Sequence, residues 1–514
     1  MAYTLDDIKQ THAYFPSLSR QWDYLHRSYL GGREYREGAY LRKYLNEDSG
    51  PGNQYILRLL NTPNYNYCKN TIDVYRSFLF RVLPTRKLGE LIEDPLVEEF
   101  IDDADKECRS LDAFMKTLSD RLQIFGSVWL AVDRPDYQAA STLEEIALGI
   151  RPYVTLFNPG RVMDWQYEYN FDGSSYLSMI KVIEESTPQF DIIKIWTPTT
   201  VTKVVVEKAK IAASANKDPL ALGNDPNNQN NYSKIIKQEE IPNPLGSIPF
   251  INVITEPGLV KGTGVSYLND VADITRSIYN KLSNLEQTIR ISGHPTLVKT
   301  AETEAAAGAG AIITMPDNLM GDLKPYLLQP SSSSIDGIIS AINADIKTID
   351  EITHLGAVRA TNGSPMSGVA LQTEFQMLNS KLSDLATILE EAEERIWELY
   401  FQWQGMEWPE DFEIAYQKNF DLRDKHADLE LFRKGLDILK GRNLLDFEAK
   451  ILEQVAELIL EDDEDIQEVC DEIENEEFAM GADINEAPPE GQNMAASPEP
   501  GEEDVPSQLG GSDM

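Results

Sequence analysis

The stretch that comes closest to a phosphate-binding loop is GLVKGTG, at residues 258–264. A P-loop holds phosphates on backbone amides and needs a lysine followed by Ser or Thr, whereas a dinucleotide-binding loop needs a third glycine. The stretch contains no such lysine, and Tyr267 stands where the third glycine would be. The sequence therefore predicts neither kind of nucleotide site.

Motifs for metal binding and nucleophilic catalysis are missing as well. The chain has no HExxH or GxSxG motif, and Cys68, Cys108 and Cys470 are too far apart for a zinc site or a disulfide framework. The acidic run at 461–465 lacks the alternating ligands and the glycine of an EF-hand loop. The sequence predicts no catalytic residue, no metal and no cofactor, and its cysteine usage indicates a reducing compartment.

The charge of the chain is strongly negative. The 85 acidic and 46 basic side chains give a formal charge of −39, and residues 457–514 hold 20 of the acidic groups and no Lys or Arg. Such a charge repels phosphates, which argues against a general nucleic-acid binder. Residues 481–514, rich in Pro, Glu, Ser and Gly, are expected to be a disordered acidic tail.

The size and hydropathy of the chain indicate an intracellular folded protein. Its 514 residues are 42% apolar, enough for about three folding units. No uncharged apolar run approaches the ~18 residues of a membrane span, and the start MAYTLDDIKQ is unlike a signal peptide. We expect no membrane association and a location in the cytoplasm during assembly.

The first 260 residues predict a mixed α+β unit. The first hundred read as helical, and we interpret their tyrosines and arginines as packing and interface residues in preference to a nucleic-acid surface. A helix over 111–125 is followed by an apolar strand over 128–132. Further β-rich runs separated by turn residues lie at 152–157, 162–165, 177–183, 190–196 and 201–206.

Two striped helices follow, separated by about forty residues of β and turn character. The first stripe has steps of three and four and contains Leu268, Val271, Thr275, Ile278, Leu282, Leu285 and Ile289. The second helix opens at the serine run 331–334, whose hydroxyls can cap it, and its stripe contains Ile335, Ile338, Ile339, Ile342, Ile346, Ile349 and Ile352. Each stripe indicates a face that must be buried.

A glycine-rich loop precedes the strongest periodic signal in the chain. GAVRATNGSPMSG, at 356–368, holds three glycines and a proline and is expected to be a loop. The region 371–403 then predicts a helix roughly 50 Å long, with apolar residues at Leu371, Phe375, Leu378, Leu382, Leu385, Leu389, Ala392, Ile396, Leu399 and Trp403. A short strand at 412–416 and two helices, at 428–440 and 444–460, complete the ordered part. The elements predict an α+β protein that is predominantly helical.

The order of these elements resembles the portal proteins of tailed bacteriophages, the head-to-tail connector family. The residues that carry the resemblance are Gly126-Ser127-Val128, Phe157-Asn158-Pro159, Gly246-Ser247-Ile248-Pro249-Phe250, Ser292-Gly293-His294-Pro295 and Ser367-Gly368-Val369-Ala370-Leu371. Each motif is weak alone, but their order is specific over about residues 15–460. The resemblance implies an α+β wing (1–260), a first stem helix (261–292), a clip (293–332), a second stem helix (333–355), a tunnel loop (356–366), a long wing helix with a return strand (367–425), a helical crown (426–480) and the acidic tail (481–514).

The resemblance also implies a function. Portal proteins form a dodecameric ring at a unique capsid vertex of the virion, through which double-stranded DNA is packaged and ejected. The implied partners are other copies of the chain, the major capsid protein and scaffold, the terminase large subunit, the head-tail adaptor and the DNA. In this interpretation the tunnel loop would meet DNA with Arg359, Thr361, Asn362 and Ser364. The stems would pack through Leu268, Leu282, Leu285, Ile289, Ile342 and Ile346, and the long helix through Leu371, Phe375, Leu378, Leu382, Leu389 and Ile396.

Two other interpretations stay open. In the first, residues 371–403 form a dimeric coiled coil in a structural or scaffolding protein of the virion. That interpretation gives no function to the α+β half of the chain. In the second, the protein is an enzyme whose site the fold assembles, with Asp133, Asp164 and His294 as candidates. The resemblance itself implies that the protein is not an enzyme.

The tunnel-loop assignment gives a first prediction. One exposed Arg359 per subunit attracts phosphate only weakly compared with the repulsion from the acidic wall of the channel. Arg359→Ala with Asn362→Ala should therefore leave rings intact and change the amount of DNA packaged per head. The DNA content of purified heads measures the effect. The alternative, about equally favoured, is that Arg359 pairs with a neighbouring carboxylate, and a variant that forms no rings would identify this interface role.

Overall fold

The computed structural model describes the chain in segments. They are residues 3–45, 47, 54–89, 91, 94–135, 142–209, 232–293, 296–301, 303–305, 313–315, 320–321, 324–328, 332–359, 368–409 and 411–420. The chain divides into two compact units, Met1–Asp421 and Leu422–Met514, and every described residue belongs to the first. The expected crown and acidic tail, including the helices expected at 428–440 and 444–460, lie outside the described residues.

Helices dominate the first 125 residues. They are α1 (Leu5–Lys9), α2 (Phe15–Leu30), α3 (Gly32–Glu37), α4 (Gln54–Asn61), α5 (Tyr67–Leu79), α6 (Pro95–Asp102) and α7 (Leu111–Phe125), with the short strand β1 (Thr85–Lys87) after α5. The predicted helix at 111–125 is confirmed, and its ends have clear causes. Ser110 caps the first turn by accepting from the Ala113 amide. Gly126 ends the helix at φ +77°, where an added Cβ would lie 2.4 Å from the Val265 carbonyl carbon.

Two antiparallel sheets follow α7. The first has the order β3-β2-β9, with β2 (Ser127–Asp133) between β3 (Tyr153–Phe157) and β9 (Phe250–Ile254), and α8 (Thr142–Leu148) precedes β3. The second is the meander β4 (Val162–Tyr169), β5 (Ser175–Ser186), β6 (Phe190–Trp196), β7 (Thr200–Lys208) and β8 (Tyr232–Pro242), with a 3-10 turn η3 (Pro159–Arg161) before β4. The five predicted β-rich runs are all strands, whereas β8 and β9 were not expected.

Helix α1 covers part of the five-stranded sheet. Ile8 of α1 is fully buried in a small cluster with residues of β4, β6, β7 and β8, namely Met163, Ile193, Ile195, Val204, Val206 and Tyr232. The meander also contributes to the main core through residues that include Ile180 and Val182. Successive side chains along these strands point to opposite faces of the sheet, and apolar residues cover both faces.

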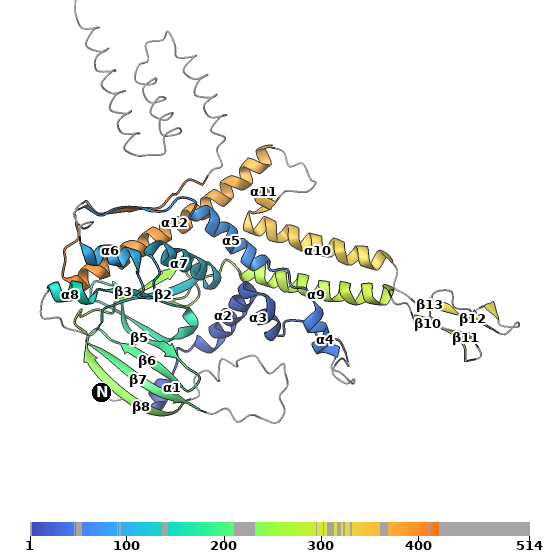
Figure 1. Ribbon diagram of the computed structural model, residues 1–514, viewed down its shortest axis with the longest axis horizontal. Helices are drawn as coiled ribbons and strands as arrows, with labels where there is room; N and C mark the ends of the chain where they lie inside the picture. Colours follow the sequence, from blue (N-terminus) through green and yellow to red (C-terminus); the bar gives the residue numbers. More distant parts are fainter. Residues whose placement is uncertain are drawn as a thin grey trace, which may run out of the picture. The chain divides into compact units, whose positions relative to one another are not determined.

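The second half of the described chain is built on three long helices (Figure 1). They are α9 (Asn269–Gly293), α10 (Ser332–Thr353) and α12 (Gly368–Gln404). Between α9 and α10 the strand β10 (Thr296–Val298) pairs with β13 (Tyr326–Leu328), and β11 (Glu304–Ala305) pairs with β12 (Ile313–Thr314), all antiparallel. Helix α10 starts within the predicted serine cap, whereas α9 starts at Asn269, so that residues 261–268 of the expected first stem are not helical.

The expected tunnel loop begins differently from the prediction. Residues Gly356–Arg359 form a short helix, α11, directly after a break at His354, whose φ of +55° is unusual for a residue other than glycine. The break explains how GAVR can be helical without continuing α10. Residues 360–367, and the side chain of Arg359, lie outside the described part of the structure.

A buried ion cluster fixes α12 to the first hundred residues. The side chain of Glu393 in α12 is fully buried, and its Oε1 pairs with Arg86 Nε of β1 at 2.5 Å. Arg86 Nη1 also contacts Asp112 Oδ1 of α7 at 2.7 Å, and the Tyr416 hydroxyl donates to Glu393 Oε2 at 2.5 Å. Burial and the adjacent Glu393 raise the pKa of Tyr416, so this phenol remains a donor. The strand pair of β1 with β14 (Glu413–Ala415) is thereby tied to α12 and α7.

Removal of the Glu393 carboxylate should destabilise the subunit strongly. Glu393→Ala leaves Arg86 buried with fewer partners, and a broken buried ion pair typically costs ~3–5 kcal/mol of the free energy of unfolding. Urea unfolding monitored by circular dichroism measures this loss. Glu391→Ala, on an exposed position of the same helix, is the control and should change stability by less than about 0.5 kcal/mol. Equal effects of the two substitutions would contradict a structural role for the cluster.

Candidate functional site

The pair of helices α9 and α10 is the candidate functional region. The two helices lie side by side and run in opposite directions, since β10 and β13 pair where α9 ends and α10 begins (Figure 1). The Lys281 ammonium of α9 pairs with Asp345 of α10 at 2.7 Å and donates to the Ala341 carbonyl at 3.3 Å. This contact holds the middle of the pair together.

The first half of α9 is embedded in the core. Its residues Val271, Ala272, Thr275, Ile278, Tyr279, Leu282 and Ser283 are buried. Thr275 lies 3.8 Å from the Cys68 sulfur of α5, and the Tyr24 hydroxyl of α2 donates to Asp273 at 3.0 Å. Helix α9 is therefore rooted on α2 and α5 over about half of its length.

An arginine clamp marks the point where the burial of α9 ends. Arg58 of α4 has a side chain only 4% exposed, and it donates to the Ser283 hydroxyl at 2.9 Å and pairs with Glu47 at 2.7 Å. Its guanidinium lies 3.9 Å from the ring centre of Tyr44, whose hydroxyl donates to Asn284 at 2.5 Å. Apart from the mixture of tyrosine and arginine in the first hundred residues, no sequence pattern predicts this clamp.

Beyond the clamp, the apolar residues of the pair are partly at the surface. No described residue of α9 after Ser283 is buried, and none of α10 before Ile342. Ile289 and Ile291 of α9 are each 47% exposed, and Ile339 of α10 is 40% exposed. The outer part of the helix pair thus carries apolar side chains that the described part of the chain does not cover.

The predicted stem residues fall into two groups. Leu268 and Leu282 of the first stripe and Ile342 of the second are buried in the subunit core, and Leu285 and Ile346 pack partly against it. Ile289 remains exposed. The periodicity that unites these residues does not distinguish a face covered by the same chain from one left uncovered.

The predicted face of the long helix is buried within the subunit. Leu378, Leu382, Leu389 and Ile396 are each at most 2% exposed, and Phe375 packs partly against the same core. The side chain of Leu371 lies outside the described residues. Near the end of α12, the Trp403 indole donates to the Val132 carbonyl of β2 at 2.8 Å.

The junction between α10 and α12 joins charged groups to aromatic rings. The Tyr75 hydroxyl of α5 donates to the Thr353 carbonyl at 2.6 Å, and the Lys381 ammonium of α12 lies 5.5 Å from the Tyr75 ring centre and 4.5 Å from that of Tyr267. Burial lowers the pKa of Lys381, and burial together with Lys381 lowers the pKa of His354. The base of the expected tunnel loop is thus held by α5 and α12, while Thr361, Asn362 and Ser364 lie outside the described residues.

Two of the residues considered for catalysis lie on strands of different sheets, Asp133 on β2 and Asp164 on β4. Asp133 pairs with Lys194 at 3.0 Å, and Asp164 is 7% exposed on β4, where burial raises its pKa. His294 lies outside the described residues. In the part of the chain that the structure describes, no group of three or more His, Cys, Asp or Glu side chains is arranged to hold a metal ion, and no helix is long and apolar enough to cross a membrane.

Comparison with known proteins does not assign the chain. No protein-family model matches its sequence, and no curated protein matches it.

Cysteine reactivity should report whether α9 remains seated on α5. Burial raises the pKa of the Cys68 thiol to about 12, so at pH 8 almost none of it is the reactive thiolate, whereas Cys108 is exposed. In a Cys470→Ser background, a maleimide should modify Cys68 at least about 100-fold more slowly than Cys108, because Cys68 reacts only when the contact opens. Mass spectrometry of timed samples measures both rates, and urea should equalise them. Similar rates in buffer would contradict the described contact between α5 and α9.

Proposed function

We propose that this protein is the portal protein of a tailed bacteriophage. Twelve copies form a ring at one capsid vertex, double-stranded DNA passes through the ring during packaging and ejection, and the ring provides the platform for the terminase motor and the head-tail adaptor. The α9–α10 pair acts as the stem, the β10–β13 region as the clip, and the segment after α11 as the tunnel loop.

The exposed isoleucines of the α9–α10 pair carry the proposal. Ile289, Ile291 and Ile339 lie on the outer part of a helical hairpin, where none of the residues that the structure describes is buried. Apolar side chains left exposed along a helix pair are costly in water, and a partner that covers them lowers this cost. Packing of each hairpin against the hairpins of neighbouring copies in a closed ring covers it on every subunit in the same way.

The charge of the chain supports a role as a conduit. A wall that attracted phosphates would retain DNA, whereas a chain with a formal charge of −39 repels the duplex and lets it slide. The clamp of Arg58 on α9 and the pair of Lys281 with Asp345 give the stem a rigid base. A rigid base keeps the bore open while DNA moves through it.

The main alternative, a coiled-coil scaffolding protein, is less compatible with the packing of α12. A dimeric coiled coil would need the apolar stripe of this helix for its partner. That stripe, including Leu382, Leu389 and Ile396, is already buried against the subunit's own core. The enzyme alternative has less support still, since the Asp133 carboxylate is held in an ion pair with Lys194.

Charged residues on the exposed stem positions should abolish ring formation. Ile289→Glu with Ile339→Glu places two carboxylates where neighbouring hairpins would pack, and buried unpaired charges are strongly unfavourable. The variant should be a folded monomer, with a circular dichroism spectrum and melting temperature close to those of the parent. Electron microscopy and light scattering should show rings near twelve subunits only for the parent.

The control makes the same chemical change away from the stem. Ile146→Glu with Leu148→Glu alters two exposed apolar residues of α8 and should leave rings intact. Leu282→Glu is unsuitable as a test of assembly, because Leu282 is buried and a charge there should unfold the subunit. Rings of unchanged mass in the Ile289/Ile339 variant, or no rings in the parent protein, would overturn the proposal.

A further inference from the structure

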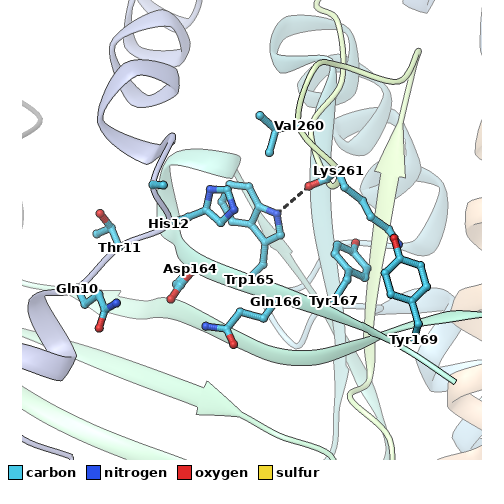
Figure 2. Close-up of a pocket in the computed structure, with 11 residues that line it drawn as sticks. Gln10, Thr11, His12, Asp164, Trp165, Gln166, Tyr167, Tyr169, Val260 and Lys261 are labelled. Atoms are coloured by element: carbon cyan, nitrogen blue, oxygen red, sulfur yellow. Dashed lines mark hydrogen bonds between the residues drawn. The ribbon is translucent and has the colours of Figure 1, made fainter.

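A depression of about 620 Å³ lies beside strand β4, as Figure 2 shows. Its most distinctive groups already contact one another. The His12 ring stacks on Trp165 with centroids 4.1 Å apart, and Lys261 Nζ lies 4.4 and 4.9 Å from the ring centres of Tyr167 and Tyr169. The depression therefore does not identify an occupant, whereas an apolar surface at the root of the stem is more informative.

Helix α4 presents leucines to solvent on the side that is turned away from its own core. Tyr55 and Leu59 are buried in a cluster with Tyr279 of α9. Leu57 and Leu60 are three positions apart, hence on one face of the helix, and they are 47% and 60% exposed. Four further large apolar residues between positions 30 and 65 are 43–93% exposed, namely Leu30, Tyr44, Leu45 and Tyr65. A surface helix normally carries polar residues on its outer face, so these leucines indicate a contact with a partner.

Helix α9 lies between α4 and α10 (Figure 1). Its Ser283 hydroxyl accepts a hydrogen bond from Arg58 of α4, whereas its Lys281 pairs with Asp345 of α10. Two residues along an α-helix are separated by about 200° of rotation, so α4 and α10 contact α9 on nearly opposite sides. In a ring of many identical copies, each contact joins two different faces of neighbouring subunits. The α4 side of one copy and the α10 side of the next are placed to meet in this way.

The exposed face of α10 has small residues where α4 has large ones. Gly337, Ser340 and Ala344 are spaced by three and four positions and are all exposed. A Cβ added at Gly337 would meet no atom of the described chain within 4 Å. Helices pack by placing the large side chains of one into the grooves of the other. Leu57 and Leu60 of α4 can therefore enter the space above the small residues of α10.

The charges around the two faces are complementary. Among the described residues in the range 40–72, every exposed charged side chain is basic, namely Arg42, Lys43 and Lys69. Helix α10 has four acidic side chains and one basic one, and one of the four, Asp345, pairs with Lys281. Opposite charges favour the approach of these two surfaces, whereas two α4 faces would bring their cations together. The charge distribution thus selects α10 of another copy over α4 of another copy.

We propose that α4 of one copy packs on the exposed face of α10 in the next copy, with Leu57 and Leu60 over Gly337, Ser340 and Ala344. The inference rests on the ring of the proposed function and adds a contact at the root of the stem, separate from the exposed isoleucines further out. Every subunit contributes its α4 to one neighbour and its α10 to the other. A closed ring then covers the leucines of every copy in the same way.

Disulfide cross-linking tests the contact. Two double-cysteine variants, Leu57→Cys with Ser340→Cys and Leu60→Cys with Ala344→Cys, are made in a Cys108→Ser and Cys470→Ser background, where the remaining Cys68 is buried. Because α9 separates α4 from α10 within a chain, a disulfide between the two new cysteines must join two copies. Mild oxidation should give a ladder of covalent multimers on a non-reducing gel, from at least one of the two pairs. Leu148→Cys with Ser340→Cys is the matched control and should give no ladder, because Leu148 is an exposed leucine of α8.

Polar substitutions measure the contribution of the leucines. Leu57→Ser with Leu60→Ser should raise the protein concentration at which half of the chains are in rings at least about tenfold, because the apolar contact is lost. Sedimentation velocity over a range of concentrations measures this midpoint, and circular dichroism should show a folded subunit because both side chains are exposed. Ile146→Ser with Leu148→Ser makes the same kind of change on α8 and should leave the midpoint unchanged.

The contact and the ring fail in different ways. Rings of the double-cysteine variants in electron micrographs, without a ladder from either pair, would overturn the contact and leave the proposed function standing. Covalent dimers from Leu57→Cys alone would show that α4 meets α4, and would also overturn it. An unchanged midpoint for the Leu57/Leu60 variant would do the same. A parent protein that forms no rings would overturn the proposed function and this contact together.

Discussion

The buried charge of Glu393 constrains the described fold more than any single apolar contact. A carboxylate without solvent needs partners, and here Arg86 of β1 and Tyr416, the residue after β14, supply them. Asp112 of α7 pairs with Nη1 of the same Arg86 guanidinium, and so links α7 to the ion cluster. Because the ion pair requires exact placement of each partner, it fixes the position of α12 along its own axis. The apolar face of that helix alone would allow several registers.

The α9–α10 pair differs from α12, because buried contacts fix it at one end only. Its root is fixed by Arg58, by the contact of Thr275 with Cys68 and by buried residues, whereas its outer part has no core beneath it. A helix pair of this kind gains little stability from its own subunit, because two helices cannot bury both of their faces against each other. Its exposed isoleucines are consistent with a surface that is completed by assembly. The polar contact between Lys281 and Asp345 sets the alignment of the two helices within the chain.

The periodicity of apolar residues predicted where the long helices lie, but it did not predict which of their faces the same chain covers. The helix at 111–125 and the long helix of α12 have strong stripes and clear end signals, and both were found close to their expected bounds. Strand β8 was missed because it lies at the edge of its sheet and alternates charged residues with only a few apolar ones, as in Lys237, Glu239 and Glu240. The stripes could not show that Leu282 is covered by its own chain and Ile289 is not. The depression beside β4 escaped prediction, because the loop that brings Lys261 to Tyr167 lies almost a hundred residues further along the chain.

The pairing of β1 with β14 has a consequence for how the protein is made. Thr85 and Ala415 are partners in this ladder, and the ion pair of Arg86 with Glu393 spans 307 positions. At 5–20 residues per second, a ribosome needs roughly 15–60 s to synthesise the chain between the two strands. During that interval β1 has no partner, and the faces of α5, α6 and α7 that pack on α12 are exposed to water. The nascent chain therefore passes through a prolonged stage at which it needs protection from aggregation, and its final closure is set by the arrival of its last described strand.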